Sequence, residues 1–345
     1  MDVSGRALVW LILPALAAIC APVPAPAQDL VPLFRKVSPS VGVIRAKGRD
    51  VTASGQVRFN ETGSGVLIST DGKMMTAAHV VDAMDEISVE FLGGETVPAR
   101  VVASEVAADL SLLQLDRVPK GAVVATLANS DTVEVGRQVI VVGAPYGLSY
   151  SMSVGWISAR WPPNTVYKTM PLAEFFQTDA TINTGNSGGP MFDLAGEVIG
   201  IVSHNISKGG GSEGLGFVVT INTAKQLLLD KKSFWGGVEG QILTDHLSDL
   251  LNLPAGATGF LIKNVAKGSP ADQMGLRGGT TYATIDGQPV VLGGDILLTV
   301  AGIPAGSAAN LARIRDLLGA AKPGTEFKGT VLRAGRVLEM SGRVP

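Results

Sequence analysis

The chain has 345 residues, of which 46% are hydrophobic and 17% charged, with a formal net charge of −2. This length predicts two globular units, and the apolar composition excludes a disordered chain. Because 28 Lys and Arg residues are balanced by 30 Asp and Glu residues, the chain lacks the basic excess of a nucleic-acid-binding protein. The 43 glycines and the 5% share of aromatic residues favour short strands and tight turns, and hence a mostly β fold.

The N-terminus carries an apolar run that approaches the length of a membrane span. Residues 7–19 read ALVWLILPALAAI, follow Arg6 and precede the small-residue pattern APA at 25–27. We therefore expect a signal peptide over residues 1–27 and an exported, periplasmic protein, or a membrane-associated one if the segment stays uncleaved. Cleavage removes Cys20, the only cysteine, so the mature chain would have no disulfide, thiolate metal site or cysteine nucleophile.

The following residues, 28–230, are predicted to form one β-rich domain. Short apolar runs such as VGVIRA, EISVEF and QVIVVG alternate with turn residues, as in a sandwich or a pair of barrels. Short helices are expected over 76–84 and 221–229. After a polar hinge at 230–233, strands alternate with helical stretches, which predicts a small α+β domain over residues 234–345.

The strongest local motif is GNSGGP at residues 185–190. A serine hydroxyl needs a base within hydrogen-bond reach to become a nucleophile, and glycines beside it let backbone N–H groups turn toward an oxyanion. We expect Ser187 to be the nucleophile, with an oxyanion hole at Gly185, Asn186 and Ser187 in which the amides of Gly185 and Ser187 are the donors. The motif also satisfies G-x-S-x-G, but Pro190 and a strand-like run follow where a nucleophile elbow requires a helix.

Three histidines, His79, His204 and His246, are candidates for the base. His79 lies in TAAHVV, where a helix is expected to begin after an apolar strand, whereas His246 lies in the polar run LTDHLSD of the second domain. His204 ends a strand and is the rival base; it is otherwise interpreted as a surface histidine without a special role, or as a substrate contact. Asp109 precedes the apolar run LSLLQL and is either a half-buried partner of an imidazole or a solvent-facing turn residue.

Taken together, these segments resemble the HtrA/Deg family of trypsin-like serine proteases. GSGVLISTDGKMMTAAHVV resembles the family's histidine segment, ADLSLLQL its aspartate segment and FFQTDATINTGNSGGPMFDLAGEVIGIVS its serine segment, in the same chain order. The resemblance covers residues from about 63 to 221 and implies a trypsin-like double β-barrel. In it, Ser187 attacks the scissile carbonyl, His79 transfers the proton, and Asp109 orients and stabilises the imidazolium.

The same resemblance implies a substrate pocket for the residue before the scissile bond (the S1 pocket). By position it is lined by Ile182, Ile206 and Leu215, which are all aliphatic. A buried Arg or Lys side chain there would have no partner, at a cost of several kcal/mol. We therefore expect cleavage after small aliphatic residues.

Residues 234–345 resemble the PDZ-like domain attached to such proteases. WGGV at 235–238 is similar to a carboxylate-binding loop, which would place Gly236, Gly237 and Val238 at the C-terminus of a bound peptide. In GSPA at 268–271, Ser269 is the expected N-cap of a short helix. The family's continuous pattern is interrupted at 279–292, where Asp-Gly at 286–287 predicts an inserted hairpin.

The function that the resemblance implies is that of an ATP-independent, exported serine endopeptidase that cleaves unfolded or misfolded proteins. A homotrimer is implied, with C-terminal peptides as ligands of the PDZ-like domain. The residues themselves lead us to expect no cofactor and no metal, ATP or nucleic acid, because the sequence has no paired His or His/Cys cluster, no P-loop and no basic excess. Two alternatives stay open. One is a chaperone or scaffold that holds clients without degrading them, and the other is a narrow processing protease regulated by C-terminal peptides.

Overall fold

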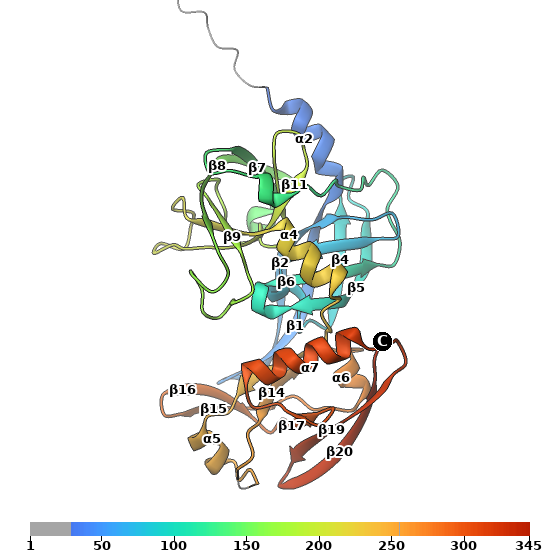
Figure 1. The fold of residues 1–345 in the computed structure, drawn as a ribbon, viewed down its shortest axis with the longest axis vertical. Coiled ribbons are helices and arrows are strands. Elements are labelled where there is room, and N and C mark those ends of the chain that lie inside the picture. Colours follow the sequence, from blue (N-terminus) through green and yellow to red (C-terminus); the bar gives the residue numbers. More distant parts are fainter. Residues whose placement is uncertain (1–28, 255) are drawn as a thin grey trace, which may run out of the picture. The chain divides into compact units, whose positions relative to one another are not determined.

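The computed structural model describes residues 29–254 and 256–345 (Figure 1). The expected signal peptide, with Cys20, lies outside the described residues. The chain divides into two units, residues 1–32 and 33–345, and helix α2 spans Val31–Val37. Within the described ranges, no helix is both long and apolar enough to cross a membrane.

Six antiparallel strands close a first barrel in the order β1-β2-β3-β6-β5-β4. From β1 to β6 they span Val41–Thr52, Gly55–Leu67, Lys73–Thr76, Glu86–Phe91, Thr96–Glu105 and Leu110–Leu115. The short helix α3, Ala78–Val81, follows β3 inside the expected range 76–84. Closure pairs every strand on both sides, so the barrel has no free edge.

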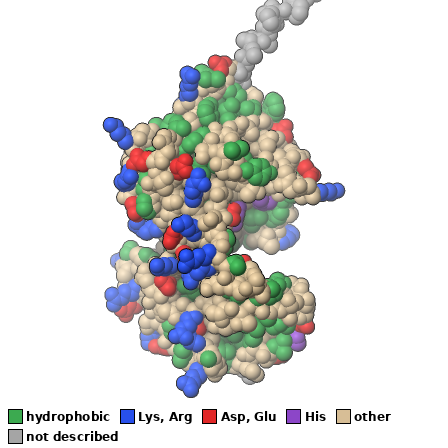
Figure 2. Space-filling model, turned by 180° about the vertical axis from the view of Figure 1, so that it is seen from behind, with side chains coloured by type: hydrophobic (Ala, Val, Ile, Leu, Met, Phe, Trp, Pro, Cys, Tyr) green, Lys and Arg blue, Asp and Glu red, His purple; other side chains and the backbone are tan. Residues whose placement is uncertain are grey.

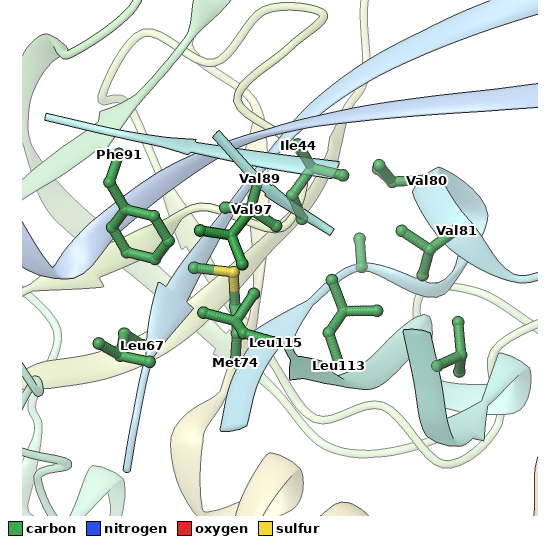
Figure 3. Close-up of a cluster of buried hydrophobic side chains, with 12 residues drawn as sticks. Ile44, Leu67, Met74, Val80, Val81, Val89, Phe91, Val97, Leu113 and Leu115 are labelled. Atoms are coloured by element: carbon green, nitrogen blue, oxygen red, sulfur yellow. The ribbon is translucent and has the colours of Figure 1, made fainter. Parts of the chain in front are cut away.

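The core of the first barrel also holds α3 in place. Met74, Phe91 and Leu113 are fully buried among the strands (Figure 3). Val80 and Val81 of α3 are buried in the same cluster. Because these two valines point into the core, the histidine that precedes them is held at a fixed place on the barrel.

A second closed barrel follows in the order β10-β11-β12-β9-β8-β7. From β7 to β12 the strands span Gln138–Gly143, Ser151–Trp161, Phe175–Thr178, Pro190–Phe192, Val198–Asn205 and Gly216–Thr220. The register of β11 against β12 shifts between Val202 and His204, so Ser203 lies in a bulge. A β-bulge changes the direction in which neighbouring side chains point, and this bulge lies beside the candidate active site.

The helix expected over 221–229 is present but irregular. It begins as α4, Ile221–Ala224, and continues as a π-helical turn over Lys225–Asp230. Short helical turns occur at Ser38–Ser40, Val106–Ala108, Ser130–Thr132 and Pro145–Gly147.

Beyond residue 233 the chain forms an antiparallel sheet in the order β13-β14-β17-β19-β20, with β18 paired to β17. These strands span Val238–Ile242, Phe260–Val265, Ile296–Val300, Glu326–Arg333, Arg336–Arg343 and Ile303–Pro304. The helices α5, α6 and α7 span Asp245–Leu250, Pro270–Gln273 and Ala308–Ala320. Ile314 and Leu318 of α7 pack on the sheet against Val331. The expected mostly β fold, with two barrels followed by an α+β region, is confirmed.

Two local predictions for this region are also confirmed. β15 (Thr281–Ile285) and β16 (Gln288–Leu292) form the expected hairpin, with positive φ angles of 51° at Asp286 and 75° at Gly287. Two successive positive φ angles are what a two-residue type I′ turn requires. The Ser269 hydroxyl accepts a hydrogen bond from the Asp272 amide at 3.2 Å and so caps α6.

The surface has no simple charge pattern on the face seen in Figure 2. Basic, acidic and hydrophobic side chains are intermixed over it.

Candidate active site

His79 is the second residue of α3, directly after the strand β3. The valines that follow it are buried, whereas the His79 side chain is 47% exposed. Successive helical residues point in different directions, so anchoring the valines leaves the imidazole free to face a substrate. The expected placement, at a helix start after an apolar strand, is confirmed.

Asp109 lies at the turn before β6 in an unusual backbone conformation. Its φ of 54° and ψ of 44° are left-handed, which Asp tolerates better than most residues because its short side chain bonds locally. The residue is only 7% exposed. The alternative of a solvent-facing turn residue is therefore wrong.

The Asp109 carboxylate accepts three kinds of hydrogen bond. His79 Nδ1 lies 2.9 Å from Oδ1 and 3.0 Å from Oδ2, and the His79 backbone amide donates to Oδ1 at 3.1 Å. The Ser203 hydroxyl donates to Oδ2. Since a carboxylate only accepts, His79 carries its proton on Nδ1 and presents the lone pair of Nε2 outward.

These contacts set the protonation states of His79 and Asp109. Burial lowers the pKa of His79, but the hydrogen bond and the negative charge of Asp109 outweigh it, so the pKa lies above its ordinary value. Burial raises the pKa of Asp109, but the hydrogen bonds from His79 and Ser203 outweigh it and leave the pKa below its ordinary value. At neutral pH the aspartate is therefore ionised and orients a basic imidazole.

Ser203 connects the three predicted residues. Its hydroxyl binds Asp109, and its carbonyl accepts a hydrogen bond from Ser187 Oγ at 3.0 Å. Among the described residues no hydrogen bond joins Ser187 to His79. Rotation about the Cα–Cβ bond of Ser187 is enough to redirect its hydroxyl, because serine has three staggered rotamers.

The loop that carries Ser187 has a shape that only glycine allows at two positions. Gly185 and Gly188 have φ angles of 100° and 81°. A Cβ on Gly185 would lie 2.1 Å from the Ala144 carbonyl oxygen, and one on Gly188 would lie 2.1 Å from Thr76 Oγ1. Both contacts are impossible for a side chain, so these glycines are fixed by positive φ and by close packing.

The amides of this loop point in different directions. The Thr184 carbonyl accepts a hydrogen bond from the Tyr146 amide at 2.7 Å, so the N–H of the same trans peptide, that of Gly185, points the opposite way. The Asn186 amide donates to the Asn183 carbonyl at 3.0 Å and is not free to bind an oxyanion, contrary to its inclusion in the predicted set. Among the hydrogen bonds of the described residues, none uses the Gly185 or Ser187 amide as its donor.

Ser64, which sequence reasoning missed, holds this loop from the first barrel. Its amide donates to the Ser187 carbonyl at 2.8 Å, and its hydroxyl donates to the Gly185 carbonyl at 2.7 Å. The same hydroxyl accepts from the Ala144 amide at 3.0 Å. Ser64 is fully buried in β2, and the signal for it is a polar residue between two glycines in the apolar run GSGVLIS.

The three residues expected to line the S1 pocket differ in exposure. Ile206 and Leu215 are 43% and 38% exposed and are joined by a backbone hydrogen bond of 2.9 Å. Ile182 is buried, and its side chain packs closely on Gly216. The pocket assignment stays a prediction.

His204 is half buried, with Nδ1 2.9 Å from Ser203 Oγ. The surface position expected for it is therefore wrong, and a contact with substrate stays a prediction. Because His79, not His204, binds Asp109 directly, His204 is not the base that the carboxylate orients.

The residues expected to bind a peptide carboxylate lie at the start of the C-terminal sheet. Gly236, Gly237 and Val238 line a cavity of about 430 Å³ together with apolar side chains such as Phe260 and Leu311. Gly237 has a φ of 72°, and a Cβ there would lie 2.2 Å from Ser269 Cβ. Within the described residues β13 pairs with β14 alone, so the other edge of β13 is open.

Comparison with known proteins shows that this chain is similar to serine proteases. Residues 63–201 match the family described as "Trypsin-like peptidase domain". A "Probable periplasmic serine endoprotease DegP-like" of Pseudomonas savastanoi pv. phaseolicola is 36% identical over 264 residues, which cover 74% of this chain and 53% of the relative. A protein of the same description from Ectopseudomonas mendocina is 35% identical over 290 residues, covering 81% of this chain and 59% of the relative.

Solved structures give the same result. A form of the HtrA-type protease AlgW carrying one substitution, with a decapeptide, matches with a TM-score of 0.55 and 27% identity, over 92% of this chain and 97% of that one. The chain spans little more than half the length of the curated relatives it matches, 53% and 59% for the two named above.

Proposed function

We propose that this chain, which carries a trypsin-like peptidase domain and is related to the DegP-like and HtrA-type proteases, is a serine endopeptidase that cleaves polypeptides. The observation that carries the proposal is the hydrogen-bonded set around Asp109. His79 Nδ1 lies 2.9 Å from this carboxylate, and Ser203 binds both Asp109 and Ser187. An oriented imidazole, linked through Ser203 to a serine hydroxyl, supports the proposal, because acyl transfer requires a base and a nucleophile.

The reaction proceeds as follows. Ser187 Oγ attacks the scissile carbonyl carbon while His79 Nε2 takes its proton, and Asp109 stabilises the imidazolium. The amides of Gly185 and Ser187 donate to the oxyanion of the tetrahedral intermediate. His79 then gives the proton to the leaving amine, and water, deprotonated by His79, hydrolyses the acyl-enzyme.

The substrate is an extended, unfolded polypeptide with a small aliphatic residue before the scissile bond. Support comes from Ile206 and Leu215, which offer exposed apolar surface. A substrate strand can also align with β11, because its residues 203–205 lie beyond the end of its pairing with β10.

Export to the periplasm and assembly into a homotrimer belong to the same proposal. The relatives are named periplasmic. Alternate residues of β8, Met152, Val154 and Trp156, expose apolar side chains on one face of the strand, as a surface buried between copies would. Light scattering after size-exclusion chromatography gives the oligomer size, and a monomer would contradict the trimer.

The C-terminal region is a PDZ-like domain that binds peptide C-termini. The open edge of β13 allows an added strand, and Gly236 and Gly237 precede it in a loop that can turn amides toward a carboxylate. A fluorescent peptide with a free C-terminus is expected to bind, and its amidated form is expected not to bind. Equal binding of both would contradict carboxylate recognition.

The deciding experiment compares the full chain with Ser187→Ala on casein. The variant is expected to lose a factor of about 10⁶ in kcat with an unchanged Tm, because the nucleophile is gone while the fold is kept. Mass spectrometry of the fragments then identifies the residue before each cut, which is expected to be Ala, Val, Ile or Leu. Equal hydrolysis by both proteins would reject the proposal, and client holding without cleavage by both would favour a chaperone.

A further inference from the structure

His204 lies next to the Asp109 pair in a pocket of aromatic rings. Its imidazole stacks on Phe217, with centroids 5.4 Å apart and planes 13° apart. The ring of Tyr167 meets it edge-on at 4.3 Å and that of Phe175 at 5.7 Å. The imidazole is therefore held on several sides by apolar surface, and one ring atom faces Ser203.

The hydrogen bonds fix which nitrogen of His204 carries the proton. Ser203 has one hydroxyl proton, and it is donated to Asp109 Oδ2. Its Oγ must therefore accept from His204 Nδ1, 2.9 Å away, which makes His204 the Nδ1–H tautomer. Nε2 is buried without a partner among the aromatic rings, an environment in which a lone pair costs less than a charged N–H.

We propose that His204 is a positioning residue for the catalytic aspartate. Its Nδ1–H holds the Ser203 hydroxyl so that the hydroxyl proton points at Asp109, which in turn orients His79. The proposal rests on the serine endopeptidase function proposed above. It adds a chain of three hydrogen bonds, from His204 through Ser203 and Asp109 to His79, that depends on a neutral imidazole at residue 204.

The groups that face His204 explain why it stays neutral. They are Asp109 at the end of the 3₁₀ turn, His79 on α3 and Tyr167 on the loop after β8. Burial lowers the pKa of His204 and the charge of Asp109 opposes this, with a net pKa below the ordinary value. In acid, a protonated His204 would place a second N–H in the apolar pocket and would repel the imidazolium that forms on His79. Both effects slow the reaction.

Two substitutions separate hydrogen bonding from packing. His204→Phe keeps a ring in the aromatic pocket and removes the donor, whereas His204→Asn removes the ring and keeps an N–H near the place of Nδ1. His246→Asn is the control, since His246 lies on α5 of the C-terminal region. We expect His204→Phe to lower kcat about three- to tenfold at unchanged KM, the range that one net hydrogen bond supplies. His204→Asn should restore most of the loss, and the control should match the parent.

A packing role predicts the opposite order, with His204→Phe near the parent and His204→Asn impaired, and that result would overturn the proposal. The pH profile gives a second readout. Over the pH range in which His204 protonates, below that of His79, kcat/KM of the parent should fall more steeply than tenfold per pH unit, whereas His204→Phe should fall about tenfold per unit throughout. Equal slopes would also overturn it.

Nitrogen-15 NMR tests the tautomer without any activity measurement. The chain has three histidines, so the signals lost in His204→Phe identify this residue. At pH 7 we expect a neutral Nδ1–H imidazole; a charged ring or an Nε2–H tautomer would refute the proposal, even if the variants misfold. A parent with this tautomer but without Ser187-dependent hydrolysis would instead refute the proposed function and leave the hydrogen-bond assignment intact.

Discussion

The two barrels contribute to the site in different ways. The first barrel fixes His79 and Asp109 by direct hydrogen bonds between the two residues and by burying the valines that follow the histidine. The second barrel carries Ser187 on a glycine-rich loop whose carbonyls are held by Ser64 of the first barrel. The proposed base and its carboxylate therefore both lie on the first barrel, with one added hydrogen bond from Ser203 of the second, while the loop of the proposed nucleophile is held by backbone and hydroxyl contacts from the first barrel.

Removing the negative charge of Asp109 in the first barrel should have the largest effect on kcat. Asp109→Asn replaces the acceptor of the Nδ1 proton, so His79 takes the wrong tautomer, and kcat is expected to fall about 10⁴-fold. Peptide hydrolysis by the purified variant measures it, with Ser187→Ala as the baseline. A loss below tenfold would mean that Asp109 does not orient the base.

Weakening the contact between the barrels should have an intermediate effect. Ser64→Ala removes the hydroxyl bonds to the Gly185 carbonyl and the Ala144 amide and keeps the amide bond to Ser187. Since the loop is loosened and no oxyanion donor is deleted, kcat should fall about ten- to a hundredfold, less than the 10²–10³ typical of a lost donor.

The matched control is Ser88→Ala, which removes a hydroxyl from β4 of the same barrel, where it binds the Arg45 carbonyl. Its kcat should equal that of the parent. If Ser64→Ala also equals the parent, the loop of Ser187 does not depend on the first barrel.

The smallest expected effect is a shift of the acid limb in the pH profile of kcat/KM. Because the pKa of His79 lies above the ordinary 6.5, the base is still protonated at pH values where a free histidine is not. The midpoint of the fall in kcat/KM at acid pH should therefore lie above pH 6.5. A midpoint at or below that value would show that Asp109 does not raise the basicity of His79.

Sequence patterns predicted the local elements of the site but not the contacts between residues far apart in the chain. The strand before His79, the helix that begins there, the glycines around Ser187 and the Asp-Gly hairpin at 286–287 follow from local patterns, and the structure contains them. The supporting contacts do not follow from such patterns. Ser64 and Gly185 are 121 positions apart, and Asp109 and Ser203 are 94 positions apart.

His204 illustrates why such contacts were missed. A histidine at the end of a strand has the sequence pattern of a surface residue. Its neighbour Ser203 reaches Asp109 from a β-bulge, and that bulge depends on how β11 pairs with β12. Propensity and periodicity describe neighbours in sequence, whereas the partners of a buried polar group are set by the closure of both barrels.

The contact between Ser64 and the loop of Ser187 has a consequence for heat inactivation. The loop cannot keep its shape once the contact between the two barrels is lost, even if each barrel is still folded. Warming should therefore abolish turnover at a lower temperature than the one at which the barrel cores melt. On cooling, turnover should return as quickly as the two folded barrels can re-associate, because neither barrel has to refold.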